Sequence, residues 1–204
     1  KIIGPIMKGI MAPIAANRAR RAGQGDSLPL TERDLPITIV AGTIIASLVP
    51  IALLLWALAD SGPIAAAPEA TIGLSLLYIL GAGVVIASVT GYMAGLIGAS
   101  NSPVSGVGIL SILGISLILV ALFGSGGGDE MTRPLVAFAL FVTAIIFGIA
   151  TISNDNLQDL KTGQLVGATP SRQQIALVLG VIFGSLVIPP ILDLLNSAFG
   201  FQGA

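Results

Sequence analysis

Long apolar stretches separated by short polar ones run through most of the chain. Residues 70–128 contain no Asp, Glu, Lys or Arg. Because a helix rises 1.5 Å per residue, about 20 apolar residues cross the roughly 30 Å hydrocarbon layer of a membrane. Measured against this length, the pattern predicts five membrane-spanning helices, at residues 35–59, 72–97, 104–123, 134–152 and 175–195.

The predicted helices are apolar on all sides, which is typical of segments surrounded by lipid. A membrane barrel would instead show segments of about ten residues with alternating hydrophobicity, and the sequence has none. We therefore predict an all-α, polytopic transmembrane helix bundle over residues 35–204. Residues 1–34 mix short apolar runs with glycine, proline and basic side chains, which predicts a cytoplasmic or interfacial segment.

The composition supports an integral membrane protein embedded in a lipid bilayer. Hydrophobic residues make up 54% of the chain and charged residues 9%, whereas soluble domains carry about 25% charged residues. The net charge of −1 gives no reason to expect a nucleic acid partner. The sequence has no histidine and no cysteine, so we expect no metal site and no cofactor, and proton transfer would depend on Asp or Glu.

The basic residues predict the orientation of the chain. With the N-terminal segment in the cytoplasm, eight of the nine Lys and Arg residues fall on the cytoplasmic side and only Arg133 falls outside. The positive-inside rule favours this orientation over its reverse.

A polar, helix-breaking stretch interrupts the uncharged region at "GASNSPVSGVG", residues 98–108. One interpretation is a polar turn at the membrane surface. The other is non-helical backbone inside the membrane, which is tolerated where it lines a watery cavity, as in transporters. On the second interpretation, the substrate path includes Asn101, Ser102, Pro103, Ser105 and Gly106, and the start of the next helix suits a carboxylate.

A second polar stretch, "ISNDNLQDLKTGQLVGATPSRQQ", covers residues 152–174. We expect a short separate helix that Asp155 and Gln158 begin as a capping box and Gly163 ends. Thr169 and Pro170 would then be the N-cap and first residue of the fifth span.

This second stretch also admits two interpretations. It is a solvated loop containing a short helix, or its carboxylates carry protons at the edge of a hydrophobic span. In the second case Asp155 and Asp159 are the proton-coupling candidates, with Lys161 as their charge partner.

Two other patterns are weaker. Residues 126–129, "GGGD", match the Gly-x-Gly-Asp of intramembrane aspartyl proteases, but the only carboxylate inside a predicted span is Asp193, so we expect no enzyme. Glycine pairs spaced four apart, at Gly91 and Gly95 and at Gly180 and Gly184, predict close helix packing.

Two long segments, "GYMAGLIGASNSPVSGVGI" and the run from Ile152 to Phe201, resemble the bacterial branch of the oligopeptide transporter family. The "ERDLP" before the first span also fits. This branch is similar to the plant yellow stripe-like transporters of metal chelates.

The resemblance implies a secondary active transporter that is driven by protons and moves oligopeptides or metal-peptide-like chelates. It also implies that the chain is part of the later half of a larger carrier and needs the carrier's other helices. The alternative is a non-transporting membrane scaffold or assembly subunit. A bacterial inner membrane is the expected location.

Overall fold

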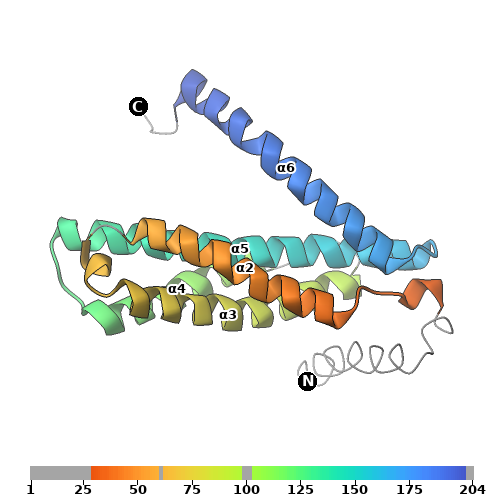
Figure 1. Ribbon diagram of the computed structural model, residues 1–204, viewed down its shortest axis with the longest axis horizontal. Helices are drawn as coiled ribbons and strands as arrows, with labels where there is room; N and C mark the ends of the chain where they lie inside the picture. Colours follow the sequence, from red (N-terminus) through yellow and green to blue (C-terminus); the bar gives the residue numbers. More distant parts are fainter. Residues whose placement is uncertain (1–28, 60–61, 98–102, 201–204) are drawn as a thin grey trace.

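The computed structural model describes residues 29–59, 62–97 and 103–200, and within them the chain is helical, with no strand (Figure 1). Five long helices follow one another: α2 (Ile37–Leu58), α3 (Pro68–Ile97), α4 (Val104–Phe123), α5 (Asp129–Leu165) and α6 (Pro170–Phe199). Two short 3-10 helices, η2 (Leu30–Glu32) and η3 (Gly62–Ala66), flank α2. All five long helices are long and apolar enough to cross a membrane. The prediction of an all-α polytopic bundle is therefore confirmed.

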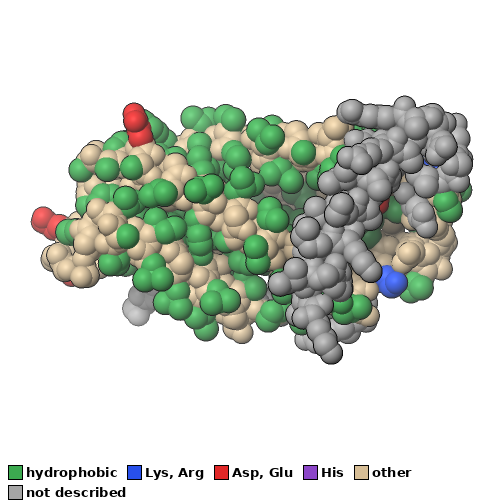
Figure 2. Space-filling model, turned by 90° about the horizontal axis from the view of Figure 1, so that it is seen from below, with side chains coloured by type: hydrophobic (Ala, Val, Ile, Leu, Met, Phe, Trp, Pro, Cys, Tyr) green, Lys and Arg blue, Asp and Glu red, His purple; other side chains and the backbone are tan. Residues whose placement is uncertain are grey.

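Helices α2 to α5 lie alongside one another with alternating direction, while α6 leaves the bundle at an angle (Figure 1). The starts of α2, α4 and α6 and the ends of α3 and α5 lie at one end, which we call the junction end. The opposite end, the far end, carries η3 and the connection between α4 and α5. Hydrophobic side chains cover the face drawn in Figure 2, and the charged side chains visible there lie toward its two ends.

Helix α5 is the centre of the bundle because it packs most extensively against α3 and, after that, against α4. Its buried side chains recur at helical spacing, with Phe138, Val142, Ile146 and Ala150 four residues apart on one face. The first three of these residues join a core shared by every element except α6 and η2, which also includes Leu55, Ile64, Ile72, Ile79, Ile115 and Leu119. Helix α6 has no buried residue in the described structure.

Glycines allow the helices to approach closely at the centre of the bundle. A Cβ atom on Gly91 of α3 would lie 2.9 Å from Ser153 Oγ of α5, whose hydroxyl donates a hydrogen bond to Ala87 O at 2.7 Å. The ring of Phe147 lies directly against Gly108, which brings α4 onto α5. The prediction of close packing is thus confirmed at Gly91.

The other predicted packing glycines have no such contact in the described structure. No atom from another part of the chain lies within 4 Å of a Cβ built on Gly95 or Gly180. Gly184 meets only Ile188 of its own helix, at 3.8 Å. The predicted pair on α6 therefore does not pack against any described helix.

The largest difference from the sequence prediction lies in α5, which does not stop near residue 152. The prediction of a separate short helix ended by Gly163 is wrong, because α5 continues through Leu165 as one helix of 37 residues. Asp155 is an interior residue of this helix and cannot be the cap of a new one. The helix ends instead just before Gly167, whose φ of +79° favours glycine.

Helix α5 continues because polarity alone does not end a helix. Residues 149–162 contain Leu, Gln and Lys, which favour helices, and neither proline nor glycine. Gly163 is tolerated because the side chain of Gln173 fills the space that a Cβ would occupy. At 37 residues α5 is about 55 Å long, much longer than the hydrocarbon layer is thick.

The other helix boundaries are close to their predictions. Helix α4 begins at Val104, directly after Pro103, and Thr169 and Pro170 are the N-cap and first residue of α6, as predicted. Helix α6 begins earlier and ends later than residues 175–195, and α5 begins at Asp129, so Pro134 lies inside it. Pro134 lies in the second turn and removes the donor for the carbonyl of Glu130, which is an exposed residue at the far end.

We expect Gly91→Val to destabilise the full-length protein by about 1–3 kcal/mol, the usual cost of overpacking a core. The added side chain must displace Ser153, which loses its hydrogen bond to α3. Thermal unfolding in detergent measures the effect. Gly95→Val is the matched control because its Cβ meets no atom within 4 Å. Equal losses of stability in the two variants would contradict the packing of Gly91 against α5.

Candidate functional site

Amide side chains and the carboxylates of Asp155 and Asp159 lie at the junction end, where three segments meet. We define the polar junction as residues 33–35 before α2, 154–163 at the end of α5, and 171–174 in the first turn of α6. Helix α5 packs against α6, and α6 packs against η2, so segments far apart in the sequence are brought side by side.

Two hydrogen bonds tie the start of α2 to the start of α6. The backbone N–H of Ser171 donates to Arg33 O at 3.1 Å. In return, the backbone N–H of Leu35 donates to Gln174 Oε1 at 3.3 Å. The first N–H groups of a helix have no partner within it, so Arg33 acts as a cap supplied from another segment. Arg33 and Leu35 of "ERDLP" therefore have a structural role at the start of α6.

Amide side chains fill the contact between α5 and α6. The side chain of Gln173 lies directly against Gly163, and its Nε2 donates to Asp159 O at 3.5 Å. The amide oxygens of Gln173 and Asn156 are both buried, and neither has a hydrogen-bond partner among the described residues. Buried acceptors without donors are costly, so these two oxygens remain available to a further donor.

The predicted proton-coupling carboxylates lie on one face of α5. Asp155 and Asp159 are one helical turn apart and both are exposed. The expected charge partner, Lys161, lies on a different side of the helix, and its Nζ donates to Gln164 Oε1 at 3.1 Å. Within the described residues, Lys161 forms no ion pair with either carboxylate.

Asn154 is a polar residue whose importance sequence analysis missed. It is only 4% exposed, and its Nδ2 donates to Asp155 Oδ1 at 3.1 Å. It continues the buried series that runs through Ile146 and Ala150 at intervals of four residues. That spacing was the signal that could have identified it, but it is visible only if α5 is taken to continue past residue 152.

The start of α4 lies at the same end of the bundle. Pro103 is its N-cap residue, and Ser105 and Gly106 are exposed in its first turn. Asn101 and Ser102, the other predicted residues of the substrate path, lie outside the described residues. The N–H groups of this first turn have no acceptor within the helix, which leaves them available to an anion.

The structure also relates the two polar stretches to each other. Gly108 of α4 contacts Phe147 of α5, and the two helices run in opposite directions. Asn154 lies seven residues after Phe147, on the same face of α5 and toward the end where α4 begins. The described part of the first stretch, residues 103–108, therefore lies near the second stretch at the junction end.

A groove of about 920 Å³ opens between α5 and α6 beside the polar junction. Asp159, Thr162 and Gln173 line its polar part, and α6 supplies most of the apolar wall. Its remaining lining residues are Gly163, Val166, Ala176, Leu177, Gly180, Val181, Gly184, Ser185 and Ile188. Its volume is in the range of small-molecule sites.

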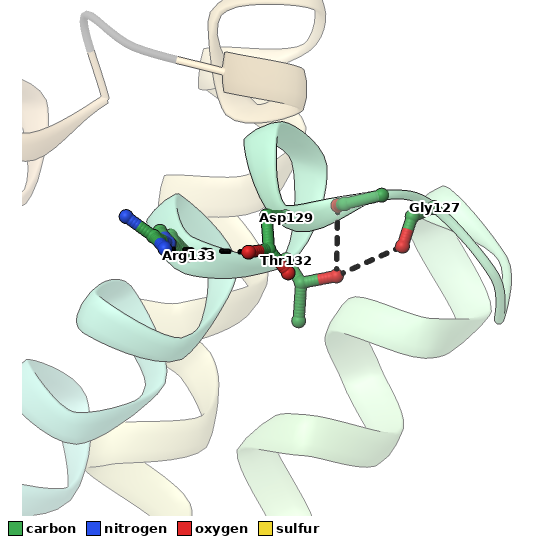
Figure 3. Close-up of polar contacts among 5 residues, drawn as sticks. Gly127, Asp129, Thr132 and Arg133 are labelled. Carbon is green, nitrogen blue, oxygen red and sulfur yellow. Dashed lines mark hydrogen bonds and ion pairs between the residues drawn. The ribbon is translucent and has the colours of Figure 1, made fainter.

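The "GGGD" stretch at the far end has a structural explanation. Figure 3 shows Asp129 and Arg133 side by side in the first turns of α5, where they form an ion pair of 3.2 Å. Thr132 Oγ1 donates to Gly127 O and Gly128 O, both at 3.1 Å. An acidic residue in the first turn also favours the helix electrostatically. In the part of the chain that the structure describes, no group of side chains is suited to a metal ion.

The contact between Arg33 and Ser171 can be tested with paired cysteines in a full-length protein without other cysteines. We expect Arg33→Cys with Ser171→Cys to form a disulfide under mild oxidation, because residues joined by a backbone hydrogen bond are within disulfide range. Mass spectrometry of the digested protein detects it. The control pairs Arg33→Cys with Val178→Cys, about 10 Å further along α6. Crosslinking of the control pair alone would contradict the docked arrangement.

The comparisons with known proteins give a consistent result. The sequence model of a family described as "OPT oligopeptide transporter protein" matches residues 4–204. A Haemophilus influenzae protein with the name "Putative oligopeptide transporter" is 40% identical over 209 residues, covering 100% of this chain and 32% of the relative. The chain thus spans about a third of that relative's length. No solved structure matches. The chain belongs to the OPT oligopeptide transporter family.

Proposed function

We propose that the chain forms part of a proton-coupled secondary active transporter for oligopeptides or metal-peptide-like chelates in a bacterial inner membrane. Its family and the name of its Haemophilus influenzae relative support transport of oligopeptides. The observation that carries the proposal is the polar junction, where Asp155 and Asp159 lie among the amide side chains of the end of α5 and the start of α6. The remaining helices of the full-length carrier complete the path.

In this proposal Asp155 and Asp159 take up and release protons. The sequence contains no histidine, so the carboxylates are the groups suited to this role. Both lie on α5, which continues from the membrane-spanning part without a break. The buried amide of Asn154 holds the carboxylate of Asp155 at a fixed position through its hydrogen bond.

The start of α4 contributes to the substrate path. Its exposed first turn, with Ser105 and Gly106, offers backbone N–H groups and a hydroxyl to the carboxylate of a peptide. Asn101 and Ser102 are included in the substrate path because of the sequence pattern alone, since they lie outside the described residues. The nearby polar junction supplies acceptors, so the two sites are complementary to the two charged ends of a peptide.

The junction end faces the cytoplasm in this proposal. Three of the described basic residues, Arg33, Lys161 and Arg172, lie at this end. Arg133 lies at the far end, where it pairs with Asp129. Cytoplasmic loops carry an excess of Lys and Arg, which supports this orientation.

We expect Asp155→Asn and Asp159→Asn in the full-length protein to abolish the acceleration of peptide uptake by an inward proton gradient. The amide keeps the size of the side chain but cannot carry a proton at physiological pH. Uptake of a labelled tripeptide into proteoliposomes, with and without the gradient, measures the effect. Asp129→Asn is the control, because that carboxylate lies in an exposed ion pair. Gradient-driven uptake that survives in both test variants would exclude these residues as proton carriers.

We expect Asn101→Ala and Ser105→Ala to raise the apparent KM for peptide by roughly tenfold each, the effect of one lost hydrogen bond to a charged group. The maximal rate at saturating peptide should change much less. Thr151→Ala serves as the control, because its exposed hydroxyl donates within α5 to Phe147 O. If KM is unchanged in both test variants, the start of α4 is not part of the path. A full-length protein without any uptake would favour the scaffold alternative.

A further inference from the structure

Two basic residues on α5 mark the two surfaces of the membrane. Arg133 lies near the start of the helix, and Lys161 follows it by 28 residues, near the end. That separation corresponds to about 42 Å of helix, which matches the thickness of a bilayer with its headgroup layers. Asp155 precedes Lys161 by six residues, so it lies about 9 Å below the level of Lys161. Since each headgroup layer is about 6 Å thick, Asp155 falls inside the edge of the hydrocarbon layer.

Helix α3 places Asp155 at the same level independently. Gly91 of α3 lies against Ser153 and Leu157 of α5, and the two helices run in the same direction. Asp155 lies between these two contacts, whereas Leu96 follows Gly91 by five residues. Leu96 is therefore about one helical turn closer to the junction end than Asp155. The side chain of Leu96 is 66% exposed, so the apolar surface of α3 extends beyond the level of Asp155.

Helix α6 gives a second comparison. Gln173 of α6 contacts Gly163 and donates to Asp159 O. Ile175 follows Gln173 by two residues, so it lies at most about 3 Å further from the junction end. Asp155 precedes Asp159 by four residues and lies about 6 Å further from that end. Ile175 is 52% exposed, so α6 also presents an apolar side chain closer to the junction end than Asp155.

A carboxylate at this level needs contact with water. Charged side chains at membrane depth pair with one another or face a water-filled cavity. Asp155 accepts a hydrogen bond from the neutral amide of Asn154, and within the described residues it forms no ion pair with Lys161. A neutral amide does not balance the charge. The exposed face of Asp155 therefore requires a polar environment that lipid cannot supply.

Exposed polar side chains connect Asp155 to the junction end. Asp155, Asp159 and Thr162 are all exposed and are spaced by four and three residues, so they lie on one face of α5. Asp159 and Thr162 also line the polar part of the groove between α5 and α6. This face of α5 offers water a continuous hydrophilic wall from the groove to Asp155.

We infer that Asp155 lies at the inner end of a water-filled vestibule that enters the apolar layer from the cytoplasm, with Asp159 and Thr162 on its wall. The inference rests on the proposed function, which places the junction end in the cytoplasm, and it gives the proton carrier an access route. Asp155 is then the carboxylate inside the membrane, and Asp159 lies at the mouth. Cytoplasmic protons reach Asp155 through water without crossing lipid.

Single cysteines in a full-length protein without other cysteines test the vestibule. The reagent is a charged, membrane-impermeant maleimide added to inside-out vesicles, which expose the cytoplasmic face. We expect Asp155→Cys to react at least about tenfold faster than Leu96→Cys and Ile175→Cys, because a thiol in apolar surroundings stays protonated and unreactive. Thr162→Cys, at the mouth, should react fastest and is the positive control.

Three results would overturn the inference. If Asp155→Cys reacts as slowly as Leu96→Cys, water does not reach this level. If Leu96→Cys and Ile175→Cys react as fast as Asp155→Cys, then Asp155 lies outside the apolar layer and needs no vestibule. Faster labelling of Asp155→Cys in right-side-out vesicles than in inside-out vesicles would contradict a cytoplasmic opening.

The unsubstituted protein provides a measurement that does not depend on the folding of a variant. A water-soluble carbodiimide with taurine converts carboxylates in contact with water into amides, and mass spectrometry of the digested protein identifies them. We expect modification of both Asp155 and Asp159. Modification of Asp159 with Asp155 left intact would overturn the vestibule.

Neither measurement requires transport, so the two proposals fail separately. A protein that is labelled as expected but takes up no peptide would overturn the proposed function and leave the access of water to Asp155 established. A protein that takes up peptide in response to a proton gradient while Asp155 stays unlabelled would overturn only the vestibule.

Discussion

The structure depends on the close packing of α5 against α3. Small residues such as Gly91 let the backbones approach, and a buried series of side chains from Phe138 to Asn154 keeps one face of α5 in contact along the bundle. In a membrane, lipid tails are as apolar as the helix surfaces, so shape and polar contacts must hold the helices together. The bond from Ser153 to Ala87 O supplies one such contact. Because α5 is fixed along this length, its polar end also has a defined position.

Much of the fold could be predicted because apolar length is a local property. Each span is apolar over about 20 residues, whatever its neighbours are. Proline also acts locally, so the starts of α4 and α6 could be placed from Pro103 and Pro170. The end of α5 could not be placed in this way. The loss of hydrophobicity after residue 152 resembles the end of a helix, and the partner that allows Gly163 to remain helical, Gln173, belongs to the next helix.

The candidate site was only partly accessible to sequence analysis for the same reason. Asp155 and Asp159 could be named because carboxylates are rare in this chain. Asn154 and Gln174 could not be named in this way. The role of Asn154 depends on its burial, and that of Gln174 depends on a backbone N–H 139 residues away in the sequence. The two polar stretches could not be placed side by side without knowing that α4 and α5 run in opposite directions, with Gly108 against Phe147. Lys161 was expected to pair with Asp155 and Asp159 because it is close to them in sequence. On the helix it lies on a different side from both carboxylates, and its side chain donates to Gln164 instead.

The unbroken length of α5 has a mechanical consequence. A continuous helix of 37 residues, about 55 Å long and packed against α3 along its length, would move as one rigid rod. A tilt of about 10° around its far end carries the other end through about 10 Å, a distance comparable to the width of a helix. The hydrogen bonds between Ser171 and Arg33 and between Leu35 and Gln174 attach the starts of α6 and α2 beside that moving end. Any tilt of α5 would therefore displace the ends of three helices together.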